Sequence, residues 1–548
     1  MGRTACVIAA LLLCAGAVPS AVRAADTRPV PSPSLAAAPD LQQEPALRAL
    51  YAARGFAPLW TGSREAERRR TAMLALLALE SRVEPAGSDT MALAGAFAKG
   101  GKPDALQQAE FRLTRAALAY LARRSGGADV PTAKALRALA DLDQAQVTPP
   151  LALALTELEI VRDLGGWHRV GTVPGPAPSV PPFEVASPEI DVAPAFPPRK
   201  RLPDIADLRR RLVQSADLPA SELAGTEMDD RLTDAVRSFQ KRHGLAPDGV
   251  VGGRTLTALN APVADQIGQV RVNLARRIED RSHLPRYVEV NVPGYELRLV
   301  EHGKVVLRSR VIVGDEDKPT PIFDNRIRYI ELNPSWYVPT SITPELLDKE
   351  RKKPGYLAKN GFYWRASAEG GGQGQLVQRP GPENALGRIK FLFPNNHSVY
   401  LHDTPQRGLF ARSERSLSHG CIRVEKPIEL ALALLSREGW DAARLDAAFA
   451  SEKTRRIELR ETVPVFLDYR TAFVDDDGRL NLRPDLYGHD AGGITVFKGK
   501  GLPPEPRPEP EPAPLAPTAD PLALRSASGD PAAVTGLGQP AAQALPRS

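Results

Sequence analysis

Prolines divide this chain more sharply than any other residue type. Nine of its 52 prolines lie between Gly165 and Arg199. Because proline fixes φ and has no N–H to donate, this stretch cannot be a continuous helix, and we expect an extended connector. A second proline-rich run, residues 503–548, has too few large apolar side chains to offset the entropy of ordering and is expected to be disordered. Single cores stop growing at roughly 250 to 300 residues, so a chain of 548 residues predicts several folded units.

The composition excludes some classes of protein. Hydrophobic residues make up 43% of the chain and charged residues 25%, as in soluble globular proteins. The formal net charge of +6 is small for this length, and no nucleic-acid-reading motif accompanies the arginines. Nucleic acid is therefore not an expected partner.

The N-terminus predicts export. Arg3 gives a positive start, an apolar run extends from Ala5 to Val18, and Val22 and Ala24 are small residues at the −3 and −1 positions of a cleavage site. The apolar run is short for a membrane span of ~20 residues. We expect a signal peptide over residues 1–24 and no transmembrane segment after its cleavage; an uncleaved anchor is the alternative.

The cysteine count then becomes informative. Cys6 and Cys14 lie in the segment to be removed, so Cys421 is the single cysteine of the mature chain. It has no partner for an internal disulfide. In an oxidising compartment such a thiol is either a buried small hydrophobe or a reactive group, and the count alone leaves both open.

The spacing of apolar residues predicts the order of the domains. A flexible lead (25–44) precedes a helical scaffold domain (45–165), the proline-rich linker (166–200), a small helical domain (201–263) and a helical link (264–285). The period then changes to two, which predicts a mainly β domain over 286–490. Its helical, glycine-containing insertion at about 340–382 is expected to be a lid. The fold class is therefore multi-domain: a mainly β, mixed and sandwich-like domain with a lid, plus two all-α domains.

Two short segments carry the residues of a nucleophilic site. His402-Asp403 ends an apolar strand, and the segment Ser418-His419-Gly420-Cys421 follows, with Cys421 19 positions after His402. A thiol with a pKa near ~8.5 is mostly protonated at neutral pH, so an acyl-transfer cysteine needs an imidazole within reach. We predict that Cys421 is the nucleophile and His402 its general base, oriented through the backbone of Asp403.

The neighbours of Cys421 have predicted roles as well. His419 and Arg423 are each two residues from the thiol, so in an extended segment they project to the same side. His419 is expected to orient substrate, stabilise the oxyanion or tune the thiolate. Gly420 lets the backbone approach a substrate closely, so the amides of Gly420 and Cys421 are the expected oxyanion donors. Arg423 suits a substrate carboxylate or a structural ion pair, and Ser418 completes the motif.

Three aromatic residues flank the expected lid. Trp336, Tyr337 and Trp364 lie in it or beside it, where they either line a substrate groove or belong to a core. No cofactor and no metal are expected.

Both of the later domains resemble known families. The segments 235–240, 243–245, 248–252 and 255–260 resemble the small peptidoglycan-binding domain. His402 followed by Ser418-His419-Gly420-Cys421 resembles the L,D-transpeptidases, and the likeness extends over residues 286–490. Many members have Asn where this chain has Arg423, and Arg423 together with this domain order resembles the large multi-domain periplasmic branch.

The resemblance implies an activity. In that family the cysteine attacks the L-centre of the third residue of a peptidoglycan stem, releases D-Ala and forms a thioester. Transfer to another stem gives a 3→3 cross-link, transfer to water is carboxypeptidase activity, and transfer to a protein amine anchors that protein to the wall. We favour the cross-link, because a binding domain would hold the enzyme on polymeric wall. Stem peptides and the glycan polymer are the implied partners, the periplasm the implied location, and carbapenems the implied acylating inhibitors.

Three other readings use the same residues. A papain-like peptidase would have its cysteine before its histidine in the chain. A zinc peptidase would recruit His402, Asp403, His419 and Cys421, but ligands two residues apart are poorly placed for a tetrahedral site. A non-catalytic wall-binding protein would not need the intact motif.

Overall fold

A computed structural model describes residues 33–80, 90–98, 103–143, 145, 149–174, 201–276, 281–366 and 374–491. The expected signal peptide, the start of the flexible lead, most of the proline-rich linker (175–200) and the tail (503–548) lie outside the described residues. Within the described ranges, no helix combines the length and the apolar character needed to cross a membrane.

The N-terminal part is helical, as the spacing of its apolar residues predicted. Several helices begin at a proline, whose fixed φ suits the first helical position and whose missing N–H is not needed there. Their apolar faces enclose a core around Tyr51, Trp60, Phe111 and Tyr120. The helices are α2 (Pro33–Ala36), α3 (Pro39–Gln43), α4 (Pro45–Ala52), α5 (Arg64–Glu80), α6 (Thr90–Ala98), α7 (Pro103–Arg124), α8 (Thr132–Asp141) and α9 (Pro150–Asp163).

The second helical domain is small, and aspartates cap the N-terminal ends of two of its helices. Asp204 accepts a hydrogen bond from the N–H of Asp207 (3.0 Å), and Asp229 accepts one from Leu232 (2.7 Å), so each begins a helix. Phe239 is at the centre of the core. The elements are the β1–β2 hairpin (Thr172–Pro174 with Arg201–Pro203), α10 (Ile205–Gln214), η1 (Ala220–Glu222), α11 (Asp230–Arg242) and α12 (Gly253–Leu259).

The expected link is helix α13 (Val263–Ala275). It shares one apolar cluster with α9 and with a hairpin made of β15 (Ala472–Val474) and β16 (Leu480–Leu482). The hairpin lies near the C-terminal end of the β domain, so α13 packs against both the scaffold domain and the β domain. The side chain of Asp217 adds a polar contact, since it forms ion pairs with Arg242 of α11 and, at 2.7 Å, with Arg479 of the hairpin.

The β domain contains one mixed sheet that closes on itself. The strand order is β12-β5-β13-β11-β10-β6-β14-β3-β4, and β4 pairs in turn with β5. Three neighbouring pairs are parallel, namely β11–β13, β12–β5 and β14–β3, and the other pairs are antiparallel. The strands are β3 (Arg286–Asn291), β4 (Glu296–Glu301), β5 (Lys304–Gly314), β6 (Asp324–Leu332), β10 (Ile389–Leu392), β11 (Leu401–His402), β12 (Ser416–Ser418), β13 (Ile422–Val424) and β14 (Arg455–Asp468).

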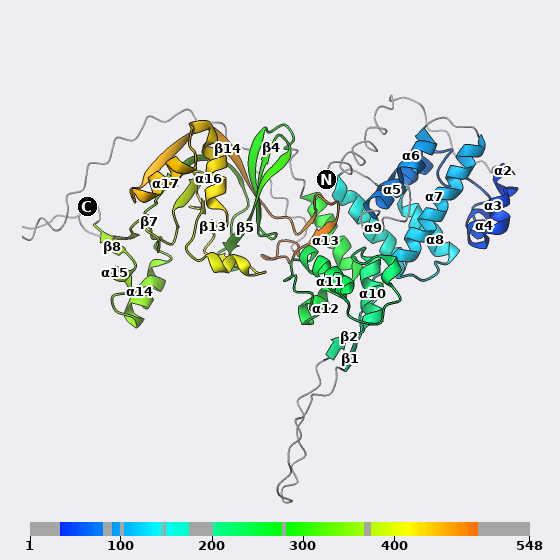
Figure 1. The fold of residues 1–548 in the computed structure, drawn as a ribbon, viewed down its shortest axis with the longest axis horizontal. Helices are drawn as coiled ribbons and strands as arrows, with labels where there is room; N and C mark the ends of the chain where they lie inside the picture. The colour runs from blue at the N-terminus through cyan, green and yellow to red at the C-terminus, as the bar shows by residue number, and fades with distance from the viewer. Residues whose placement is uncertain are drawn as a thin grey trace, which may run out of the picture. The chain divides into compact units, whose positions relative to one another are not determined.

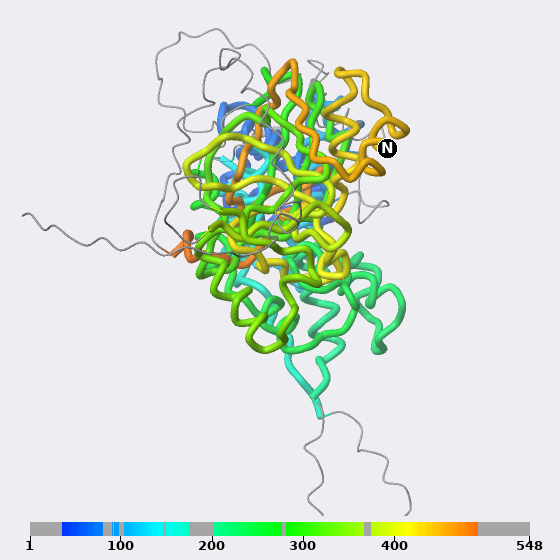
Figure 2. The backbone as a smooth tube through the Cα atoms, turned by 90° about the vertical axis from the view of Figure 1, so that its left-hand side faces the viewer, coloured from blue at the N-terminus to red at the C-terminus, as the bar shows by residue number. Residues whose placement is uncertain are grey.

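Period-two apolar residues of these strands form the core. Val288, Leu299, Ile330, Phe391 and Val465 are all fully buried in it. The core is completed by α16 (Pro427–Leu435) and α17 (Ala442–Ala450), with η3 (Ser436–Glu438) between them. β14, late in the chain, pairs in parallel with the early strand β3. Figures 1 and 2 show this late, orange part of the chain running among the green strands of the β domain.

The insertion between β6 and β10 is a small lobe with its own core. It contains β7 (Trp336–Tyr337), α14 (Thr343–Lys352), α15 (Tyr356–Lys359), β8 (Phe362–Arg365) and β9 (Gln375–Gln378), in the sheet order β7-β9-β8. Val338, Leu346 and Leu376 form its centre. In Figure 1 this lobe lies apart from α16 and α17. It coincides with most of the expected lid and is called the lid below.

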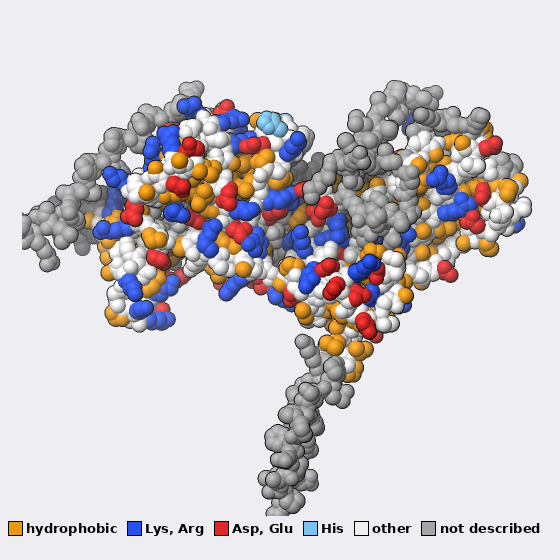
Figure 3. All heavy atoms as spheres, viewed as in Figure 1, with side chains coloured by type: hydrophobic (Ala, Val, Ile, Leu, Met, Phe, Trp, Pro, Cys, Tyr) orange, Lys and Arg blue, Asp and Glu red, His pale blue; other side chains and the backbone are white. Residues whose placement is uncertain are grey.

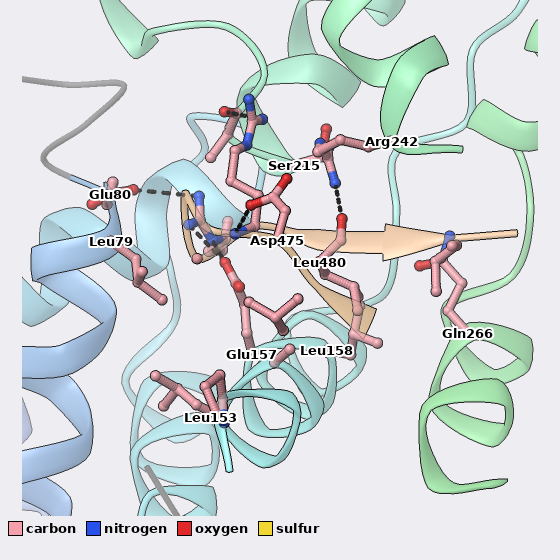
Figure 4. Close-up of a pocket in the computed structure, with 18 of the residues that line it drawn as sticks. Leu79, Glu80, Leu153, Glu157, Leu158, Ser215, Arg242, Gln266, Asp475 and Leu480 are labelled. Atoms are coloured by element: carbon pink, nitrogen blue, oxygen red, sulfur yellow. Dashed lines mark hydrogen bonds and ion pairs between the residues drawn. The ribbon is translucent and has the colours of Figure 1, made fainter. Parts of the chain in front are cut away.

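A cavity of about 370 Å³ is lined by residues of the helical domains and of the β15–β16 hairpin. Leucines of α5, α9 and the β15–β16 hairpin give it apolar walls, and Glu80, Glu157, Arg242 and Asp475 are among the charged side chains around it (Figure 4). On the face drawn in Figure 3, acidic and basic side chains are interspersed. Nothing about this cavity resembles the predicted nucleophilic site.

Candidate active site

The sheet brings the two predicted segments together. Strands β11 and β13 are parallel neighbours, with Leu401 opposite Ile422 and His402 opposite Arg423. The N–H of Ile422 donates to the carbonyl of Tyr400 at 3.1 Å, just where Cys421 precedes the strand. His402, in β11, and Cys421, which directly precedes β13, are 19 positions apart in sequence and are brought together by this pairing of strands.

His402 is a buried, neutral imidazole. Only 4% of its surface is exposed, and its Nδ1 lies 2.5 Å from the carbonyl oxygen of Asp403. Because a carbonyl can only accept, Nδ1 carries the proton and Nε2 keeps its lone pair. Burial, followed by the nearby Arg423 cation, lowers the pKa of His402 to about 3. The carbonyl of Asp403 opposes this shift.

The Cys421 thiol lies in a mixed environment. Its Sγ is 3.7 Å from the carbonyl oxygen of Ser398. Burial raises the pKa of Cys421, whereas the N–H and hydroxyl of Tyr400 and the cations Lys390 and Arg423 lower it. The resting thiol is therefore protonated, but its surroundings favour the thiolate once the proton has gone.

Lys390 and Tyr400 are site residues that the sequence reading missed. Lys390 lies opposite His402 in the β10–β11 pair, and its Nζ is 4.0 Å from the centre of the Tyr400 ring. Tyr400 is two residues before His402, and the two rings are 5.7 Å apart. Period-two alternation puts Tyr400 on the side of His402. Lys390 is positioned by the pairing of β10 with β11. The alternation of residues along one strand does not show which strands pair.

A turn held by side-chain oxygens presents the Cys421 thiol. The Ser418 hydroxyl donates to the carbonyl of Cys421 at 2.5 Å, and the Thr320 hydroxyl donates to the carbonyl of Gly420 at 2.8 Å. Gly420 has φ +103°, a conformation that favours glycine. Its N–H donates to Ser418 Oγ at 3.3 Å, so it is engaged in this arrangement rather than free for an oxyanion. The N–H of Cys421 has no acceptor among the described residues.

Asp403 and Arg423 have separate surroundings. The Asp403 carboxylate accepts from the N–H of Arg388 (2.9 Å) and from Arg407 (3.0 Å), so only its backbone carbonyl orients His402. Arg423 donates to Gln406 Oε1 at 2.8 Å and has no acidic partner in the described part of the chain. It is therefore a cation available beside the thiol, rather than half of a structural ion pair.

The remaining predicted residues involve the lid. His419 Nε2 lies 2.9 Å from Glu345 Oε1 of helix α14. Trp336 packs on Phe362 within the lid, at a ring distance of 6.0 Å, whereas Tyr337 and Trp364 are each 47% exposed. None of these three aromatic residues makes a hydrogen bond or ring contact with Cys421 or His402 among the described residues. The described ranges also hold no group of three or more acidic, His or Cys side chains arranged to bind a metal ion.

Comparisons with known proteins assign the domains. Models of the L,D-transpeptidase catalytic domain and of the scaffold domain match residues 285–439 and 45–160. A model described provisionally as a peptidoglycan-binding domain matches residues 201–259. A curated protein of Haemophilus influenzae, which its name assigns provisionally to the L,D-transpeptidases, is 37% identical over 220 residues. That match covers 37% of this chain and 44% of the relative, so the chain spans less than half of the relative's length.

Solved L,D-transpeptidases are more distant. Those of Stackebrandtia nassauensis and Xylanimonas cellulosilytica are 16% and 19% identical and cover 48% of this chain. The matches span 91% and 93% of those chains, with TM-scores of 0.21 and 0.19, which add nothing to the assignment. The three matching domains and the curated relative agree with one another. Residues 285–439 are therefore an L,D-transpeptidase catalytic domain, preceded in the chain by a scaffold domain and by a domain that matches the peptidoglycan-binding model.

Proposed function

We propose that this protein forms 3→3 cross-links between peptidoglycan stems, with Cys421 as the nucleophile. The observation that supports the proposal is the parallel register of β11 and β13, which brings His402 to the strand next to the one that Cys421 precedes, while the N–H of Tyr400 and the cations Lys390 and Arg423 act on the thiol. Such an arrangement serves acyl transfer, because it supplies a base and stabilises the thiolate. The peptidoglycan-binding domain supports a polymeric wall substrate.

The first half-reaction transfers an acyl group to the enzyme. Nε2 of His402 takes the thiol proton, and the thiolate attacks the carbonyl carbon of the third stem residue at its L-centre. The free N–H of Cys421 is the donor for the oxyanion. When the tetrahedral intermediate collapses, the proton passes from His402 to the departing amine of D-Ala, and a thioester remains on Cys421.

The acceptor decides the product. An amine of a second stem gives the cross-link, water gives a carboxypeptidase, and a protein amine gives wall attachment. Arg423, a cation without an acidic partner among the described residues, is assigned to a stem carboxylate. Ser418 and Thr320 hold the nucleophile turn, and Tyr337 and Trp364 offer exposed rings to a bound stem. We further propose a periplasmic location after cleavage of residues 1–24.

The test is product analysis with a matched variant. Purified residues 25–548 and Cys421→Ala are incubated with disaccharide-tetrapeptide, and the products are weighed by mass spectrometry. The expected product is a dimer equal to two substrates minus one D-Ala, absent with the variant. Release of D-Ala without dimer would favour the carboxypeptidase or a protein acceptor. No reaction at all would favour a non-catalytic wall-binding protein.

Three reagents separate a cysteine enzyme from a metalloenzyme. A carbapenem should add its own mass to Cys421, because the thiolate opens the strained ring, and the Cys421→Ala variant should remain unmodified. Iodoacetamide should abolish turnover and a chelator should leave it unchanged. Loss of activity with the chelator would instead support a zinc peptidase.

A further inference from the structure

A second histidine beside the nucleophile is paired with a carboxylate of the lid. His419 lies two residues before Cys421, and its Nε2 is 2.9 Å from Glu345 Oε1. The same oxygen is 3.1 Å from Lys318 Nζ. The pair is accessible to solvent, with 31% of the His419 side chain and 46% of the Glu345 side chain exposed.

Glu345 is ionised in this setting. The hydrogen bond from His419 and then that from Lys318 lower its pKa. It also lies in the first turn of α14, where the N-terminal end of the helix favours a negative charge. The carboxylate fixes the proton of the ring on Nε2, so Nδ1 of His419 keeps its lone pair. Nδ1 has no hydrogen-bond partner among the described residues.

His402 has the opposite surroundings. Its strand neighbours are Lys390 and Arg423, both cations. Glu331 lies opposite Lys390 on β6 and partly offsets that charge. During acylation the negative charge of the Cys421 thiolate offsets the positive charge of protonated His402. In the thioester the sulfur is neutral, and a second proton on His402 would then face the two cations without that balance.

The second half-reaction needs a base that can carry a positive charge. An attacking amine must lose a proton as its C–N bond forms. An imidazole next to a carboxylate gains this proton readily, because the product is an ion pair. Of the two histidines, only His419 has a carboxylate hydrogen-bonded to its ring.

We propose that His419, held by Glu345, is the general base of the acyl-acceptor step, whereas His402 serves the acyl-donor step. The amine nitrogen attacks the thioester carbon while Nδ1 of His419 takes its proton. The C–S bond then breaks, the new amide is released, and the proton returns to the Cys421 sulfur. No further reactant is needed. Glu345 is a positioning residue that acts through His419, and because it belongs to the lid, the base is complete only with the lid in place.

This inference rests on the proposed function, and its test separates the two half-reactions. The full chain is mixed with disaccharide-tetrapeptide, and D-Ala released in the first turnover is measured beside dimer formation. The variant Glu345→Gln keeps the shape of the side chain but removes its charge. Asp348→Asn, on the same helix and paired with Arg351 and Lys352, is the matched control.

We expect Glu345→Gln to slow the acceptor step and to leave the donor step nearly unchanged. Glu345→Gln should keep the first-turnover release of D-Ala within about two-fold and slow dimer formation on the order of 10²-fold, the range of general-base catalysis. Acyl-enzyme should accumulate in its mass spectrum. Hydroxylamine, an acceptor that is neutral at the assay pH, should restore transfer, while Asp348→Asn should behave as the unmodified enzyme.

Other outcomes overturn the proposal. Equal losses in D-Ala release and transfer would show that Glu345 acts on the fold of the lid rather than on the acceptor. Unchanged transfer would show that His419 needs no carboxylate. If the unmodified enzyme releases no D-Ala, the proposed function itself fails, and this is seen before any variant is compared.

Discussion

Gly420 offers a direct test of how the backbone aims the thiol. Its φ of +103° lies outside the regions that residues with a Cβ readily adopt. A Cβ built there would be 3.6 Å from the carbonyl oxygen of Pro319 and 3.8 Å from that of Lys318, which are ordinary contacts. The penalty for Gly420→Ala is therefore conformational rather than steric.

A second glycine with a positive φ serves as a matched control for the loss of stability expected at Gly420. Holding alanine at an unfavourable φ costs about 1–3 kcal/mol. Gly439, at the end of η3, has φ +71° with nothing within 4 Å of its Cβ position, so Gly439→Ala should cost about 1–2 kcal/mol. For a domain of this size each kcal/mol lowers the melting temperature by about 2–4 °C. Both variants should therefore melt a few degrees lower.

Gly420→Ala should lose activity, whereas Gly439→Ala should keep it. The strained alanine relaxes next to Cys421, and a displacement of about 1 Å at a reacting group costs on the order of 10²-fold in rate. Melting temperature, first-turnover release of D-Ala and alkylation of Cys421 are measured on both variants. If Gly420→Ala is destabilised but turns over as fast as Gly439→Ala, the unusual φ does not aim the nucleophile.

Three further predictions concern charge. Lys390→Met removes a cation that lowers the pKa of Cys421, so the onset of alkylation by iodoacetamide should move to higher pH, and an unchanged profile would refute that role. Asp468 accepts two 2.8 Å hydrogen bonds from buried Arg281; its replacement by Ala leaves that cation with only its 3.3 Å contact to Glu289 and should destabilise the domain by about 1.5–3 kcal/mol in urea unfolding, whereas an unchanged midpoint would contradict the argument. Because the pKa of His402 is about 3 in the folded chain and ~6.5 when unfolded, its contribution to stability is complete above pH ~6.5 and is lost as the pH falls toward 3. His402→Gln should accordingly lose less melting temperature between pH 7 and pH 5 than the unmodified protein, and equal losses would contradict it.

Local patterns were enough to predict the fold class and to single out Cys421 as a candidate nucleophile. Helical spacing and the change to period two marked the scaffold and the sheet, and the single cysteine with its neighbouring histidine marked the site. These signals are contained in short windows of sequence, where side-chain periodicity is expressed directly.

Contacts between distant strands could not be predicted in the same way. Lys390 belongs to the site because β10 lies beside β11, and Glu345 reaches His419 from 74 positions away. Strand order and lid docking depend on tertiary packing, which alternation does not encode. The hydrogen bond from the Gly420 N–H to Ser418 was not predicted for the same reason, because its acceptor is positioned by a turn and not by a periodic element.

The register between β11 and β13 also bears on how such proteins are recognised. The relative position of His402 and Cys421 is determined by hydrogen bonds between two adjacent strands, not by the number of residues that connect them. The connection leaves the sheet after His402, forms the short helix η2 (Arg407–Ala411) and returns through β12. Insertions or deletions near η2 would change the length of the connection and leave the dyad where it is. A search that demands a fixed spacing between the histidine and the cysteine would therefore overlook chains with the same site, whereas one that allows this distance to vary would find them.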